Sequence, residues 1–140
     1  MTAQKIDGTA IAKQVREEVK EKVAARVAAG KSKPGLATVL VGEDEASKVY
    51  VGMKKRMCER LGMESYAHTL PADASQEEVE GLVTKLNADP KVNGILVQLP
   101  LPGHLDEEKV LQAIDITKDI DGFHPINIGR LSMKGREPLF

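Results

Sequence analysis

Several residue types are scarce in this chain, and their scarcity limits what it can be. Among 140 residues there are one cysteine, no tryptophan, two phenylalanines and two tyrosines. The single Cys58 excludes an internal disulfide and a zinc site built from several cysteines, and it is typical of a reducing compartment such as the cytoplasm. The 20 basic and 21 acidic residues are interleaved without a basic tail. With so few aromatic side chains to stack on bases, this balance argues against nucleic-acid binding.

Long hydrophobic runs are also missing. No segment reaches the length of a membrane span, and the first residues, MTAQKIDGTA, lack the apolar stretch of a secretion signal. The histidines at 68, 104 and 124 are scattered without ligand spacing, so we expect no metal site. The length and the hydrophobic content of 41% predict one domain over 1–140 that can bury a core.

Helical and strand patterns alternate along the chain. A long amphipathic helix, capped at Thr9 and ended by Gly30, is expected to help close the core, because apolar residues recur there every four positions: Ile11, Val15, Val19, Val23 and Val27. The segments 36–41, 64–70 and 94–97 are expected strands. Further helices are expected before Gly62, after the capping-box pattern at Ser75, and last over 106–114. This alternation predicts an α/β fold of three layers, α/β/α, with a mostly parallel sheet.

The segment VGEDEASKVYVGMKKR places three polar side chains at helical spacing. Ser47, Tyr50 and Lys54 are three and four residues apart, so they share one helix face near the end of a buried strand. In open α/β sheets ligands bind at this edge. An alternative stays open, because Val49, Met53 and Met57 also repeat at helical spacing. In this alternative they form the core stripe, with Tyr50 at its edge and Lys54 in solvent.

Two later segments add polar groups at the same sheet edge. Gln98 directly follows the strand at 94–97, and its amide needs partners there, either loop backbone or a lysine. The prolines of the QLPLPG loop remove backbone donors and predict a fixed wall. In KDIDG, Asp119 and Asp121 should point to opposite sides of an extended segment, one toward solvent and the other toward the site.

Four ordered motifs together carry a resemblance: IDGTAIA, VGEDEASKVYVGMKKR, GILVQLPLPGH and KDIDGFHPINIGRL. The sequence resembles the amino-terminal half of the bifunctional methylenetetrahydrofolate dehydrogenase/methenyltetrahydrofolate cyclohydrolase family, over essentially all 140 residues. The resemblance implies oxidation of 5,10-methylenetetrahydrofolate and hydrolysis of the methenyl product to 10-formyltetrahydrofolate. It also implies a folate cleft between two α/β domains, the second of them a Rossmann domain that binds NADP, and a homodimer of the full-length protein.

The resemblance assigns roles to matching positions. It implies that Lys54 is catalytic, with Tyr50 and Gln98 as its partners. The substrate would be bound by those two residues and by four more: Ser47, Leu99, Pro100 and Asp121. The carboxylate of Asp121 would accept hydrogen bonds from adjacent N–H groups of the pterin.

The cofactor half of the family has no counterpart in this sequence. The family continues into the NADP domain past the position of Phe140, and the 12 glycines here never form a Gly-x-Gly-x-x-Gly pattern. We therefore expect the cofactor site beyond residue 140. We also expect these 140 residues to fold, to lack dehydrogenase activity alone and to bind folates weakly. A non-catalytic folate- or pterin-binding module and an interaction domain of similar fold remain alternatives.

Overall fold

A three-stranded parallel sheet forms the centre of the computed structural model, which describes residues 6–133. The strands are β1 (Gly35–Val41), β2 (Glu64–Leu70) and β3 (Gly94–Val97), in the order β2-β1-β3. In the central strand β1 every residue except Leu36 is buried. The short strand β3 is buried throughout. Continuous apolar strands of this kind are typical of a parallel sheet that is covered on both faces.

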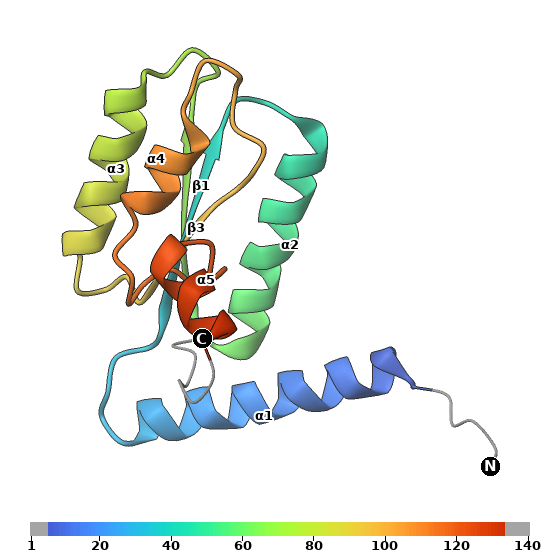
Figure 1. Cartoon of the computed structure of the whole chain (residues 1–140). Helices are drawn as coiled ribbons and strands as arrows, with labels where there is room; N and C mark the ends of the chain where they lie inside the picture. Colours follow the sequence, from blue (N-terminus) through green and yellow to red (C-terminus); the bar gives the residue numbers. More distant parts are fainter. Residues whose placement is uncertain (1–5, 134–140) are drawn as a thin grey trace.

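Helices cover the two faces of the sheet. Figure 1 shows α2 (Glu45–Leu61) on one side, with α3 (Gln76–Ala88) and α4 (Glu107–Gln112) on the other. The main apolar core lies on the α3 and α4 side, where Val79, Val83 and Val110 are fully buried against β1 and β3. The predicted α/β class and its three layers are confirmed.

The local signals for α3 are confirmed in detail. The Ser75 hydroxyl accepts the N–H of Glu78 at 3.2 Å, and the Glu78 carboxylate accepts the N–H of Ser75 at 2.8 Å. This reciprocal pair satisfies two N–H groups that the helix itself leaves free, which is why the pattern marks a helix start. The helix α2 ends as predicted at Gly62, whose φ of 77° is easily reached only without a Cβ.

The first helix differs from the prediction. The helix α1 (Gly8–Ala28) is capped by Asp7 instead of Thr9, and of its apolar residues only Val23 is buried. Ile11 and Val15 are 52% and 50% exposed, so α1 does not close the core. Residues four apart on a helix differ in direction by about 40°, so five at this spacing spread over about 160° and do not share one face.

A second difference lies near the end of the described range. The sequence predicts no helix after the segment 106–114, yet α5 (Pro125–Ser132) follows there. The sequence contained a signal for the start of this helix, because Pro125 occupies its first position. In the structure the Nδ1 of His124 also caps the helix by accepting the N–H of Ile126 at 3.2 Å. Among residues 6–133, no helix combines the length and apolarity needed to cross a bilayer.

Candidate active site

A lysine and a glutamine from separate elements meet beside the sheet. The Nζ of Lys54, in the middle of α2, donates a hydrogen bond to the Oε1 of Gln98 at 2.9 Å. Gln98 directly follows β3, and its own Nε2 donates to the Leu99 carbonyl at 2.8 Å. The glutamine amide is thus fixed in one orientation, with its oxygen toward the lysine. Both interactions that the sequence allowed for Gln98, with loop backbone and with a lysine, occur together.

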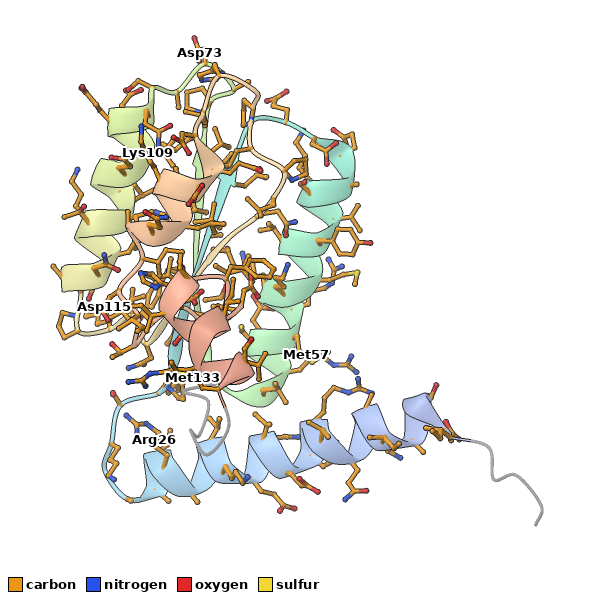
Figure 2. All side chains as sticks on the ribbon, in the orientation of Figure 1. Arg26, Met57, Asp73, Lys109, Asp115 and Met133 are labelled. Carbon is orange, nitrogen blue, oxygen red and sulfur yellow. The ribbon has the colours of Figure 1, made fainter. Side chains whose placement is uncertain are left out.

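Lys54 belongs to the face of α2 that packs on the sheet. The buried and half-buried residues on this face are alternately four and three positions apart: Ser47, Val51, Lys54, Cys58 and Leu61. The alternative core stripe is wrong, because Val49 and Met53 are 58% and 49% exposed. Met57 lies toward the end of α2 nearest α1 (Figure 2). There it lines a surface hollow together with Arg16 and Lys20.

Tyr50 and Ser47 lie on α2 at different distances from the lysine. The Tyr50 ring is one turn before Lys54, with its centroid 5.9 Å from the ammonium nitrogen, and it is 54% exposed and open to a ligand. Ser47 lies two turns before Lys54, about 10 Å along the helix axis. Its side chain is buried, and its N–H donates to the Asp44 carboxylate at 2.7 Å, which caps the helix.

The loop after β3 is held at several points. The N–H of Leu101 donates to the Oε2 of Glu107 at 2.7 Å, and Leu99 packs against the apolar core. The Leu99–Pro100 peptide bond is cis, and Pro100 is exposed. The loop therefore presents Pro100 to solvent while Leu99 is directed inward.

The two aspartates of KDIDG are arranged differently from the prediction. The segment is a turn, closed by a hydrogen bond of 3.4 Å from the Gly122 N–H to the Asp119 carbonyl, and it is not extended. Asp119 does not face solvent: it is 1% exposed and accepts three hydrogen bonds. Asp121 is the exposed member of the pair.

Asp121 interacts electrostatically with Lys54. Partial burial raises the pKa of the Asp121 carboxyl above its usual value, the positive charge of Lys54 opposes this rise, and the negative charge of Asp119 adds to it. The site therefore combines an amine, a phenol, an amide and a carboxylate from α2, the β3 loop and the KDIDG turn.

Sequence reasoning missed the contacts that hold this turn. The N–H of Ile95 donates to the Lys118 carbonyl at 2.8 Å, which joins the segment before the turn to β3. A Cβ on Gly94 would lie 2.4 Å from the Cγ2 of Ile120. Glycine at the start of a buried strand was a usable signal, because it marks a close approach of another segment.

The described residues do not fit a dinucleotide. In dinucleotide-binding domains the pyrophosphate lies at the turn between a strand and a helix N-terminus. Here the turn after β1 carries Glu43, Asp44 and Glu45, and the Ser47 N–H is already bound to Asp44. These carboxylates would repel the phosphates. Within 6–133 there is also no group of three or more His, Cys, Asp or Glu side chains placed to hold a metal ion.

Comparison with known proteins identifies relatives of this chain. The model of the tetrahydrofolate dehydrogenase/cyclohydrolase catalytic domain matches residues 6–121. The bifunctional methylenetetrahydrofolate dehydrogenase/cyclohydrolase of Campylobacter jejuni is 41% identical with a TM-score of 0.87, over 93% of this chain and 46% of that one. The 5,10-methylenetetrahydrofolate dehydrogenase of the silkworm Bombyx mori is 40% identical with a TM-score of 0.88, over 93% and 45%.

A third relative is the methylenetetrahydrofolate dehydrogenase-cyclohydrolase of Trypanosoma brucei, solved with NADP and an inhibitor. It is 36% identical with a TM-score of 0.90, over 99% of this chain and 47% of that one. The chain thus spans a little under half the length of these relatives. The resemblance inferred from the sequence is confirmed, and this chain belongs to the tetrahydrofolate dehydrogenase/cyclohydrolase family.

Proposed function

We propose that this chain binds a one-carbon tetrahydrofolate and supplies the proton-transfer groups that hydrolyse its methenyl form to 10-formyltetrahydrofolate. The observation that carries the proposal is the hydrogen bond of 2.9 Å between the Nζ of Lys54 and the Oε1 of Gln98. It joins a titratable group to an oriented partner at the carboxyl edge of a parallel sheet, where such folds bind ligands. The centroid of the Tyr50 ring is 5.9 Å from the same Nζ, and the positive charge of Lys54 acts on the Asp121 carboxyl.

Methenyl hydrolysis requires proton transfers. Water adds to the electrophilic methenyl carbon and loses a proton, and one ring nitrogen then takes up a proton as its bond to that carbon breaks. Lys54 is the group positioned to accept and return these protons. Gln98 holds one N–H of the lysine and leaves the rest of the amine free to face the one-carbon unit. The hydrogen bond thus orients the lysine.

The surrounding residues fit recognition of the folate. Asp121 is exposed and offers two acceptor oxygens, which match adjacent N–H groups of a pterin. The exposed Tyr50 ring provides a surface on which the flat pterin or benzoyl ring packs. Leu99, Pro100 and Ser47 are assigned supporting roles in substrate binding, Ser47 by shaping the start of α2.

The longer protein in which these residues occur is proposed to couple hydrolysis to oxidation of the methylene form. NADP, when bound, supplies the hydride acceptor, and the Trypanosoma brucei relative was solved with it. Because the turn at 43–45 is acidic, we propose that residues outside the described range bind this cofactor. A homodimer and a cytoplasmic location complete the proposal, the latter because the single cysteine is free and buried.

Replacement of Lys54 tests the hydrolytic role. In the complete protein that carries this chain, Lys54→Met keeps the aliphatic bulk and removes the amine. We expect methenyltetrahydrofolate hydrolysis to fall by about 10² to 10⁴, the usual loss for a proton-transfer group, while folate binding persists. Decay of the methenyl absorbance reports turnover, and calorimetry reports binding.

The matched control is Lys55→Met, which removes an exposed amine from the neighbouring position of α2. It should leave both quantities unchanged. Near-normal hydrolysis by the Lys54 variant would contradict the assignment. Folate binding without hydrolysis in the unmodified protein would instead indicate a non-catalytic folate-binding module, and absence of both would favour an interaction domain.

A further inference from the structure

The Asp119 carboxylate is buried and holds the start of α5. Its side chain is 1% exposed and accepts the His124 N–H at 2.8 Å, the Phe123 N–H at 3.3 Å and the Asn127 Nδ2 at 2.8 Å. A buried carboxylate without such partners is strongly disfavoured. The two backbone donors lie at the N-terminus of α5, where a negative charge is stabilised. Asp119 therefore fixes the chain that follows the KDIDG turn.

The residue before Asp119 fixes the chain that precedes the turn. The ammonium of Lys118 donates to three carbonyl groups around the end of α3: Leu86 at 3.1 Å, Asn87 at 2.7 Å and Asp89 at 2.9 Å. The backbone of the same segment pairs with β3, where Ile95 bridges to Asp119. The turn is thus anchored on α3 and β3 before Asp119 and on α5 after it.

Asp121 lies between these two anchors. The hydrogen bond from the Gly122 N–H to the Asp119 carbonyl closes the turn around it, and Gly122 adopts a positive φ of 70°. The direction of the Asp121 side chain is therefore set by the turn. The conformation of this turn depends on the hydrogen bonds that the Asp119 carboxylate accepts.

We propose that Asp119 is a positioning residue that aims the Asp121 carboxylate at the folate without touching the folate itself. This inference rests on the proposed function, because it uses the assignment of Asp121 to pterin recognition. At 1% exposure Asp119 is closed to any ligand, so its effect on binding passes through Asp121. Loss of its charge releases the start of α5, so the turn no longer fixes the direction of the Asp121 carboxylate.

A double-mutant cycle separates positioning from a general structural role. Folate affinity is measured by calorimetry in the complete protein, for Asp119→Asn, Asp121→Asn and the double variant. Asp119→Asn keeps the shape of the side chain and converts one acceptor into a donor that faces other donors. We expect it to weaken folate binding by about tenfold, and the double variant to bind no more weakly than Asp121→Asn alone.

Controls make each outcome decisive. Val110→Ala removes volume from a fully buried site on α4 and should lower stability without changing folate affinity. Should Asp119→Asn fail to fold, Asn127→Ala replaces it in the cycle, since it removes one of the three donors to Asp119 and leaves the backbone donors in place.

The outcomes distinguish this inference from the function on which it rests. Additive losses in the cycle, or unchanged affinity in the Asp119 and Asn127 variants, would overturn the positioning role while the proposed function stands. No folate binding by the unmodified protein would overturn the proposed function and this inference together.

Discussion

Lys54 occupies a helix position that usually carries an apolar side chain. It stands between Val51 and Cys58 on the face of α2 that packs on the sheet. The hydrogen bond to the Gln98 Oε1 and the nearby Tyr50 ring compensate for the partial burial of the Lys54 ammonium. A polar residue inside a core-facing stripe breaks the local rule for stability, and such exceptions are typical of functional sites.

The carboxylate of Asp121 is expected to contribute directly to folate affinity. Asp121→Asn turns one acceptor oxygen into a donor and sets it against a donor of the pterin. We expect folate binding to weaken by about 1.5 to 3 kcal/mol, the usual value for a hydrogen bond to a charged group. Glu21→Gln, which removes an exposed negative charge from α1, is the control and should bind folate normally. Equal losses in both variants, measured by titration, would show a non-specific charge effect.

The raised pKa of Asp121 gives the same binding a pH dependence. Burial raises this pKa and Lys54 opposes the rise, so the carboxylate takes up a proton at a higher pH than an ordinary aspartate does. In the proposed function, the ionised form of Asp121 is the one that accepts the pterin hydrogen bonds. Folate affinity should therefore decrease as the pH falls through this raised pKa, and the decrease should disappear in Asp121→Asn. A pH profile shared by both proteins would assign the titration to another group.

At the scale of single residues, the sequence predicted which side chains share a helix face better than it predicted which side chains are buried. The spacing of Tyr50 and Lys54 predicted one helix face, and the structure confirms it. The opposite directions assigned to Asp119 and Asp121 assumed an extended segment. The assumption was wrong because Gly122 closes a turn there. A turn and a short strand have similar local composition, and the deciding contacts are hydrogen bonds to the Asp119 carboxylate from Phe123, His124 and Asn127, which composition does not reveal.

At the scale of elements, the strand and helix positions were largely predictable. The three strands are bounded by glycines or prolines, and α3 carries a complete capping box. The face that α2 turns to the sheet was not predictable from apolar residues alone, since Ser47, Lys54 and Cys58 alternate on it with only two aliphatic residues. The exposed Val49 and Met53 gave the stronger, and misleading, periodic signal.

The junction between β3 and the KDIDG turn should tolerate no side chain at residue 94. Gly94→Ala places a methyl group 2.4 Å from the Cγ2 of Ile120, so the Ile120 side chain or the segment that carries it must shift. We expect a loss of about 1 to 3 kcal/mol in the free energy of unfolding, the usual cost of overpacking. Chemical denaturation measures it, and folate affinity should fall as well.

A matched glycine makes this test specific. Gly81, inside α3, has open space where a Cβ would stand, so Gly81→Ala should raise the free energy of unfolding by about 0.5 to 1 kcal/mol. The double variant Gly94→Ala with Ile120→Ala should recover part of the lost stability. Similar effects of alanine at 94 and at 81 would contradict the proposed contact.

At the scale of the whole molecule, the sheet and its other helices form a compact unit, and α1 lies at its edge, against the end of α2 (Figure 1). Only Val23 of α1 is buried, and a surface hollow of about 590 Å³ is lined by α1 and the end of α2 together. The sequence predicted the helix itself but placed it in the core. Periodicity shows that a segment is helical, while what the helix packs against depends on contacts distant in the sequence.

The proposed division between folate and cofactor functions also belongs to the scale of the whole molecule. The acidic turn at 43–45 and the capped start of α2 leave no phosphate site there. We expect the isolated 140-residue chain to bind NADP no better than background, measured by calorimetry, and to form no reduced cofactor from methylenetetrahydrofolate. Saturable cofactor reduction by this chain would show that the nucleotide site lies within it.

The most direct test of the folate site is a crystal structure of the complete protein with 5-formyltetrahydrofolate, a stable one-carbon folate. We expect the pterin N–H groups to contact the Asp121 carboxylate, and the one-carbon group to lie within about 3.5 Å of the Lys54 Nζ, a distance suited to reaction. A folate bound away from Lys54, for example in the hollow between α1 and α2, would contradict the assignment of this lysine.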